Sequence, residues 1–166
     1  PLTASTVPTL AQSQAVQDGM AEVLLNGNLR GKPTVIVSGR SDALVPVNHS
    51  SRAYAAFNRS VEGTRSRLVY VEVVNAQHFD AFLPFSGFDN RYVPLHPYFV
   101  SAMDAMYEHL RSGTALPGSQ VVRAIPRGGS PGAAPALTES NIPPMAATPA
   151  VANTISYVGS TIQIPQ

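Results

Sequence analysis

Asp42 and His78 are an acid and a base that each follow an apolar, β-branched segment of the chain, at 34–38 and 68–74 respectively. A carboxylate that accepts a hydrogen bond from imidazole Nδ1 fixes the tautomer of the ring. It also stabilises the imidazolium that forms when Nε2 takes a proton from a nucleophile. If the fold brings them together, Asp42 and His78 are two members of a hydrolytic triad.

The two apolar segments are predicted to be parallel strands joined by a helix. Both are short and rich in β-branched residues, which indicates strands buried on both faces. Between them, Asn48 is expected to cap a helix that ends at Gly63. Residues 34–74 then form a βαβ unit, whose strands end at the same edge of the sheet about 4.8 Å apart. Asp42 and His78 are therefore expected to meet at that edge.

Two further helices flank this unit. The first is predicted over residues 8–25, with Pro8 in its first turn and an Asn-Gly pair at its end. The last begins near Pro97 and ends before Gly113. Two strands cannot cover helices on both faces of a sheet. We therefore predict that residues 1–112 are the C-terminal part of a larger α/β domain with a parallel sheet and flanking helices.

Residues 113–166 differ in composition from the part before them. They hold eight of the fifteen prolines and six of the twelve glycines, but only three charged residues. Disordered segments are normally polar and highly charged, whereas this one keeps apolar pieces at 121–122 and 155–158. It is predicted to be an extended tail, rich in proline and glycine, that packs on the body of the domain or on a companion chain.

Each member of the acid–base pair also has an ordinary structural explanation. An aspartate between a strand and a helix commonly shapes a turn, and a single histidine after a strand is commonly a hydrogen-bonded structural group. Asp42 and His78 nevertheless occupy successive loops at one edge, in the acid-then-histidine order that the hydrolase fold uses. Their joint position favours catalysis. Asp80 is the rival acid, but two residues after His78 it is poorly placed to reach that ring from behind.

The sequence offers no convincing nucleophile. A catalytic serine needs a backbone N–H on the next residue to help bind the oxyanion. The literal match to the Gly-x-Ser-x-Gly pattern is GGSPG at 128–132, where Pro131 has no N–H and no strand of convincing length precedes Ser130. We treat this match as accidental. The serine is expected in a companion chain or in a lost part of the same precursor.

A regular series of aromatic residues follows His78. Prolines and glycines within the series prevent one continuous helix. The rings either anchor a long loop to the core or form an apolar wall for an ester substrate. In the second interpretation, the two nearest to His78, Phe79 and Phe82, bind substrate. The series consists of Phe79, Phe82, Phe85, Phe88 and Tyr92.

The composition argues against several other classes of protein. The net charge is +1 and the arginines are scattered, so no basic patch predicts a nucleic-acid partner. No apolar run reaches the roughly 18–20 residues that cross a membrane. The chain lacks cysteine, and no two of its four histidines have the spacing of a metal motif, so neither a metal nor another cofactor is predicted. The first residues, PLTAS, do not form a signal peptide, and Pro1 in place of Met is what a cleavage product would show.

Beyond these patterns, the chain resembles the D-(−)-3-hydroxybutyrate oligomer hydrolases, bacterial enzymes that act after poly(3-hydroxybutyrate) depolymerases. The most specific segments are GKPTVIVSGRSDALVP at 31–46 and NAQHFDAF at 75–82. Two others that look similar are PLHPYF at 94–99 and RGGSPGAAPA at 127–136. The resemblance covers most of the chain.

The resemblance implies an α/β-hydrolase fold and a serine esterase that cleaves soluble 3-hydroxybutyrate oligomers to monomers. It makes Asp42 the triad acid and His78 the triad base. Chains of the family are several times longer, and their serine and oxyanion loop have no counterpart here. An N-terminal companion chain from the same precursor is therefore expected to supply them, and this chain alone is expected to be inactive. The resemblance also favours a secreted or periplasmic location.

Two other functions stay open. The chain could be a non-catalytic module that completes the sheet of another protein or docks a partner. It could also keep the hydrolase scaffold but act on aromatic esters, as the related tannase and feruloyl-esterase group does. A small-molecule ester substrate is expected in either esterase reading, with no nucleic-acid or membrane partner.

Overall fold

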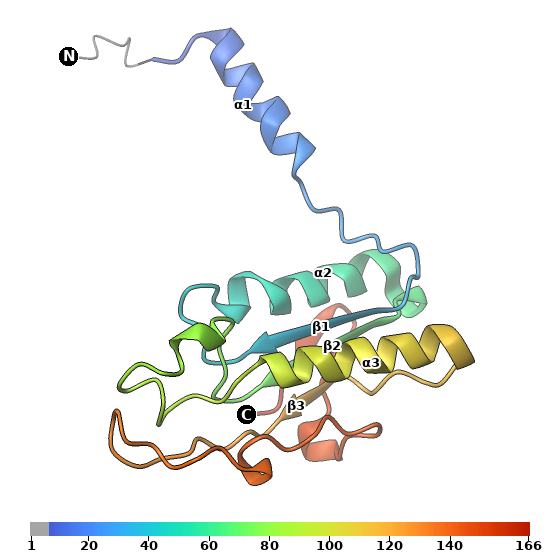
Figure 1. The fold of residues 1–166 in the computed structure, drawn as a ribbon. Coiled ribbons are helices and arrows are strands. Elements are labelled where there is room, and N and C mark those ends of the chain that lie inside the picture. The colour runs from blue at the N-terminus through green and yellow to red at the C-terminus, as the bar shows by residue number, and fades with distance from the viewer. Residues whose placement is uncertain (1–6) are drawn as a thin grey trace, which may run out of the picture.

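The structure, a computed structural model that describes residues 7–166, centres on a three-stranded parallel sheet (Figure 1). Ile36 lies opposite Tyr70 in one pair of strands, and Val73 lies opposite Val122 in the other. The predicted parallel sheet with flanking helices is confirmed. The first five residues, PLTAS, lie outside the described part. In the order in which they lie, the strands are β1 (Thr34–Gly39), β2 (Leu68–Val73) and β3 (Gln120–Val122).

Helices α2 (Ser51–Glu62) and α3 (His96–Ser112) cover opposite faces of the sheet (Figure 1). On the α2 face, a cluster of buried side chains gathers around Ala55 and Tyr70. On the α3 face, a second cluster includes Tyr98. The alternation of side chains along a strand sends successive residues of β2 into these two clusters. The sheet is thus the middle of three layers.

The antiparallel hairpin of β4 (Ser156–Val158) and β5 (Thr161–Gln163) packs on the α2 side of the sheet. Ile162 and Ile164 contact the buried cluster there. The rest of the chain runs in loops with short 3₁₀ helices. These are Val47–His49, Gly63–Arg65, Asp80–Phe82, Glu139–Asn141 and Val151–Asn153.

Strand β3 is, with the β4–β5 hairpin, an element that the sequence analysis missed. It lies in the segment interpreted as tail, where Val74 N donates to Val122 O at 3.0 Å and Ser119 Oγ accepts from Tyr70 N at 3.0 Å. Three residues between proline-containing segments give no strand pattern of their own. Their pairing with β2 buries them, so tertiary context decides this element.

The first helix differs from its prediction. Residues 8–25 were expected to be helical with Pro8 in the first turn, but α1 (Leu10–Glu22) begins after the N-cap Thr9. Thr9 and Gln12 form a capping box that fixes this start. None of the residues of α1 is buried, and Figure 1 shows the helix standing away from the sheet.

Helices α2 and α3 both end where predicted, but only α3 also starts where predicted. Asn48 does not cap α2, because a 3₁₀ turn intervenes and its side-chain oxygen accepts from Arg52 Nη1 at 2.9 Å instead. Helix α3 begins at His96, so the following proline falls in its first turn as predicted. Gly113 ends α3 in the left-handed conformation at φ 75°. Across residues 7–166, no helix combines the length and the apolar character needed to cross a bilayer.

Strand β1 lies at an open edge of the sheet. It was predicted to be buried on both faces, but all its residues except Gly39 are only half-buried. Central β2, by contrast, is fully buried from Tyr70 to Val73. Among the described residues β1 has β2 as its one strand neighbour, which leaves its outward backbone groups without a strand partner.

Gly39 ends β1 at a place where two loops touch. A Cβ atom there would lie 2.3 Å from Ala76 O and 2.4 Å from the carbonyl carbon of the same residue. We expect Gly39→Ala to lower the free energy of unfolding by about 1–3 kcal/mol, because the backbone must shift to remove this overlap. Urea unfolding would measure the loss. Gly19→Ala is the matched control, since that glycine lies in exposed α1 with open space around it and should be neutral or slightly stabilising.

Candidate active site

The loops that carry Asp42 and His78 are joined at the carboxyl edge of the sheet. Arg40 N donates to Val73 O at 2.8 Å, and Ser41 N donates to Ala76 O at 3.0 Å. These bonds continue the β1–β2 ladder beyond the last strand residue. They bring the two loops into contact, as the parallel arrangement predicts.

Asp42 and His78 form a direct, short hydrogen bond. His78 Nδ1 donates to Asp42 Oδ2. The other carboxylate oxygen of Asp42 accepts from Leu44 N at 3.0 Å and from Val45 N at 2.9 Å. The carboxylate is therefore held on both sides, and it in turn sets the orientation of the imidazole. The sequence predicted the pair, but not the two amides that fix the acid.

The surroundings of Asp42 favour its ionised form. Burial alone would raise the pKa of this carboxyl, which is 9% exposed. The hydrogen bonds from Val45 N, from the His78 ring and from Leu44 N outweigh burial and lower the pKa below its ordinary value. Asp42 thus carries its charge at neutral pH, as an acid that orients a histidine requires.

The lowered pKa of Asp42 predicts a loss of stability in acid. The carboxyl binds protons more weakly in the folded chain than in the unfolded chain, where its pKa is about 3.9. The ionised carboxyl therefore stabilises the fold above that pH, and this stabilisation is lost as the pH falls through the pKa of Asp42 in the folded chain. Urea unfolding between about pH 6 and pH 2 should show that the free energy of unfolding falls more steeply for the wild type than for Asp42→Asn. Parallel curves would contradict this prediction.

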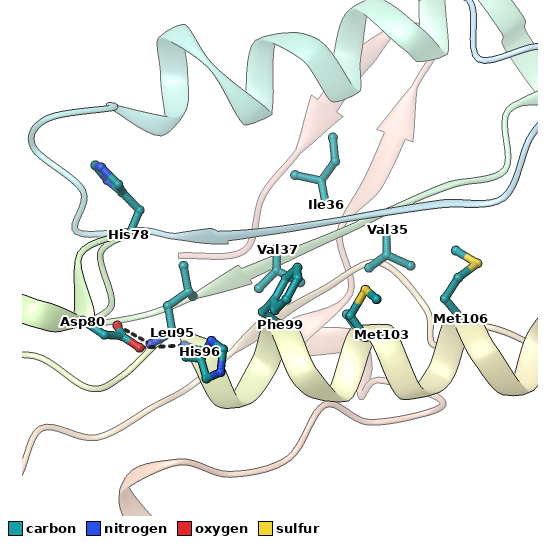
Figure 2. Close-up of a pocket in the computed structure, with 11 residues that line it drawn as sticks. Val35, Ile36, Val37, His78, Asp80, Leu95, His96, Phe99, Met103 and Met106 are labelled. Atoms are coloured by element: carbon teal, nitrogen blue, oxygen red, sulfur yellow. Dashed lines mark hydrogen bonds between the residues drawn. The ribbon is translucent and has the colours of Figure 1, made fainter.

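The second ring nitrogen of His78 is free to take a proton. The side chain is 34% exposed, and no residue within 7–166 hydrogen-bonds its Nε2 atom. Its ring lies against Phe79, with centroids 3.9 Å apart. His78 also lines a pocket of about 680 Å³ between β1 and α3 (Figure 2).

This pocket is mostly apolar. Figure 2 shows Val35 and Val37 of β1 facing side chains of α3, with His78 and Asp80 at one end. Strand β1, which lines one side of the pocket, is the edge strand of the sheet. Its lining residues from α3 are His96, Phe99, Ala102, Met103 and Met106.

Asp80 holds helix α3 instead of the histidine. Its two carboxylate oxygens accept from Leu95 N and His96 N, each at 2.8 Å (Figure 2). The side chains of Asp80 and His78 point to different sides of their loop. A carboxylate at the start of a helix satisfies free N–H groups and favours the helix dipole. The structure therefore gives Asp80 a structural position and Asp42 the contact with the imidazole.

The aromatic series forms a chain of ring contacts that starts at His78. Phe79 and Phe82 have centroids 5.1 Å apart, and Phe82 also contacts Phe85 at 5.9 Å and Phe88 at 5.6 Å. Phe82 is half-buried at the centre of these contacts, whereas Phe79 is 42% exposed beside the imidazole. Phe82 thus anchors the loop, and Phe79 offers an apolar surface next to His78.

No serine within residues 7–166 hydrogen-bonds the His78 ring. Ser130 lies in a loop tied down elsewhere, since Asn90 Nδ2 donates to Gly129 O at 2.9 Å. A pocket of about 290 Å³ does bring three serines near Asp42 and His78: Ser38, Ser50 and Ser51. Ser50 Oγ donates to Pro46 O at 3.0 Å, and Ser51 Oγ lies 3.1 Å from Tyr70 OH.

These features define a parallel α/β protein with a carboxylate–imidazole pair at the carboxyl edge of its sheet. The chain belongs to the 3HB-oligomer hydrolase family (3HBOH), whose model matches residues 2–166. No solved structure matches the chain significantly.

Three curated relatives are each named D-(-)-3-hydroxybutyrate oligomer hydrolase. The relative from Paracidovorax citrulli is 55% identical over 95% of this chain and 23% of its own length. The one from Burkholderia ambifaria is 60% identical over 86% of this chain and 20% of its own length. The one from Cupriavidus necator is 57% identical over 93% of this chain and 22% of its own length. The chain thus spans less than a quarter of the curated relatives that it matches.

Proposed function

We propose that this chain supplies the acid and the base of a serine esterase that hydrolyses D-3-hydroxybutyrate oligomers to monomers. The observation that carries the proposal is the hydrogen bond between His78 Nδ1 and Asp42 Oδ2 at the carboxyl edge of the sheet. The relatives are named for hydrolysis of these oligomers, whose units are joined by ester bonds. A charged, oriented carboxylate behind an imidazole is the arrangement that ester hydrolysis by a serine needs.

The proposed reaction is acyl transfer in two steps. A serine hydroxyl attacks the ester carbonyl while His78 Nε2 takes its proton, and His78 then gives the proton to the departing alcohol. Water attacks the acyl-serine in the second step, with His78 again accepting and returning a proton. Asp42 stays ionised throughout and stabilises the imidazolium.

We place the serine and the oxyanion donors on a companion portion of the same protein. Two observations support this assignment. Within residues 7–166 no serine is bonded to His78, and the relatives are more than four times as long as the region that they share with this chain. The open edge of β1 and the apolar pocket beside it are the surfaces that such a portion would cover.

Phe79 and Phe82 complete the proposal as the apolar wall of the substrate site. The exposed ring of Phe79 lies against the catalytic imidazole, so it can contact the methyl groups of a bound oligomer. Phe82 supports that ring from behind through its own contact with Phe79.

The test compares this chain with the protein that includes the companion portion. Assays with a D-3-hydroxybutyrate trimer should show release of monomer by the assembled protein and none by the 166-residue chain alone. Equal activity of the isolated chain would place the nucleophile within it and contradict the proposal. Preference for a feruloyl or gallate ester would transfer the proposal to aromatic substrates. Absence of hydrolysis with either class would favour a non-catalytic module.

A further inference from the structure

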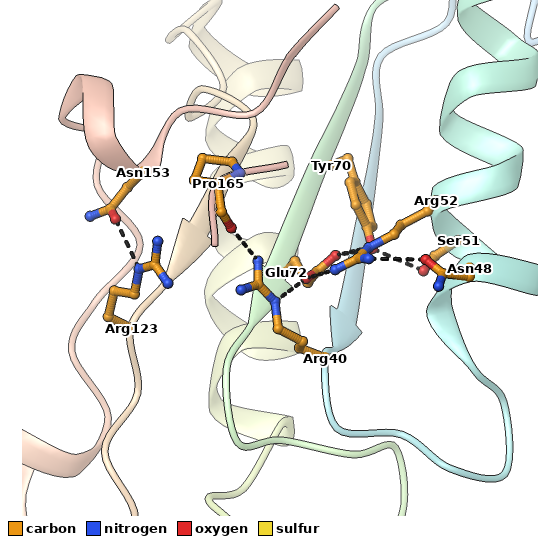
Figure 3. A network of polar contacts seen from close by, with 9 residues as sticks. All are labelled: Arg40, Asn48, Ser51, Arg52, Tyr70, Glu72, Arg123, Asn153 and Pro165. Atoms are coloured by element: carbon orange, nitrogen blue, oxygen red, sulfur yellow. Dashed lines mark hydrogen bonds and ion pairs between the residues drawn. The ribbon is translucent and has the colours of Figure 1, made fainter. Parts of the chain in front are cut away.

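Glu72 is a charged residue in the centre of the sheet. It lies on β2, and its side chain is 0% exposed. Arg52 donates to both of its oxygens, at 2.5 Å and 2.7 Å, and Tyr70 OH donates at 2.9 Å (Figure 3). Arg40 Nε makes a further, short ion pair with it. The sequence pattern shows only a glutamate in an otherwise apolar strand.

Burying the charges of this network costs desolvation free energy, which their pairing must offset. Burial alone would raise the pKa of the Glu72 carboxyl, but the guanidinium groups of Arg52 and Arg40 and the hydroxyl of Tyr70 outweigh burial and lower it. Glu72 is thus ionised and paired. A buried ion pair contributes little net stability compared with apolar side chains of similar size, so its value lies in fixing one geometry.

The network fixes the geometry of the acid loop, the loop after β1 that carries Asp42. Arg40 lies two residues before Asp42, and its Nη2 also donates to Pro165 O at 2.9 Å. Its side chain therefore ties the loop after β1 both to β2 and to the last residues of the chain (Figure 3). The same strand β2 leads directly into the loop that carries His78.

We propose that Arg40 and Glu72 are positioning residues that hold Asp42 in register with His78, with the carbonyl of Pro165 as a second anchor for Arg40. Neither residue touches the imidazole, so they act through the loop. The catalytic meaning of this role rests on the proposed function above. The geometric claim does not, because the contact between Asp42 and His78 can be observed without any hydrolysis.

The network contains its own matched comparison, because Arg40 and Arg52 bind the same carboxylate from different elements. Arg40→Met removes the link to the acid loop and leaves Glu72 paired with Arg52. Arg52→Met removes the link to α2 and leaves Glu72 paired with Arg40. Both substitutions delete one half-buried guanidinium from the same network.

The readout is the proton NMR signal of His78 Nδ1–H in the 166-residue chain. A proton in a short bond to a carboxylate is strongly deshielded and protected from exchange with water, and Asp42→Asn identifies the signal by altering or abolishing it. We expect Arg40→Met to speed exchange of this proton at least about tenfold, because the hydrogen bond between Asp42 and His78 opens more easily without the link to Glu72. A tenfold change corresponds to about 1.4 kcal/mol in the free energy of opening. Arg52→Met should keep the wild-type exchange rate.

Only the loss of protection in Arg40→Met with its retention in Arg52→Met supports the proposal. Equal rates in the two variants overturn it, and so does a wild-type spectrum without the signal. If Arg40→Met does not fold, as judged by its amide spectrum, Glu72→Gln decides, and an unchanged signal in that variant overturns the proposal. An assembled protein that hydrolyses no ester would refute the proposed function but would leave this measurement and its outcome intact.

Discussion

Replacing His78 with alanine in the assembled protein should lower kcat for a D-3-hydroxybutyrate trimer by about 10⁴-fold or more. The substitution removes both the base that activates the serine and the acid that protonates the departing alcohol. KM should change much less than kcat, because the imidazole acts on the reacting atoms instead of holding the rest of the substrate. Steady-state kinetics with the trimer, at matched protein concentration, measures the effect.

His96→Ala is the matched control for this experiment. His96 lines the same pocket as His78, and the centroid of its ring lies 6.1 Å from that of Phe99. Within residues 7–166 its side chain makes no hydrogen bond, so no carboxylate orients it as Asp42 orients His78. This variant should keep most of the wild-type kcat. A His78→Ala variant that remains folded and retains kcat within about tenfold of the wild type would show that another group is the base.

Strands β1 and β2 could be predicted because their own residues determine them. Segments 34–38 and 68–74 are short, apolar and β-branched, and the helix between them forces a parallel arrangement. The short strand β3 could not be found in this way, since its three residues become a strand only by pairing with β2. The start of helix α1 could have been predicted, because Thr9 and Gln12, three residues apart, form a capping box, but the prediction placed Pro8 in the first turn.

The site could be predicted as far as chain order determines it. Parallel strands bring successive loops to one edge, so Asp42 and His78 could be paired without coordinates. What fixes them could not be seen: the amides of Leu44 and Val45, and the ion pair of Arg40 with Glu72. These contacts depend on loop conformation or on side chains far apart in the chain, for which a single sequence has no periodic signal.

Asp42→Asn in the assembled protein should lower kcat by about 10⁴-fold, whereas Asp80→Asn should change it little. An asparagine at 42 can donate to the imidazole through its amide, which favours the wrong tautomer and removes the charge that stabilises the imidazolium. Asparagine at 80 can still accept from one of the two N–H groups, Leu95 N or His96 N, through its amide oxygen, so it keeps part of the link to α3 without touching the imidazole.

The two variants form a comparison within one assay, since both change a carboxylate to an amide, one in the loop after β1 and the other in the loop after β2. A large loss in Asp80→Asn with an active Asp42→Asn would instead make Asp80 the acid.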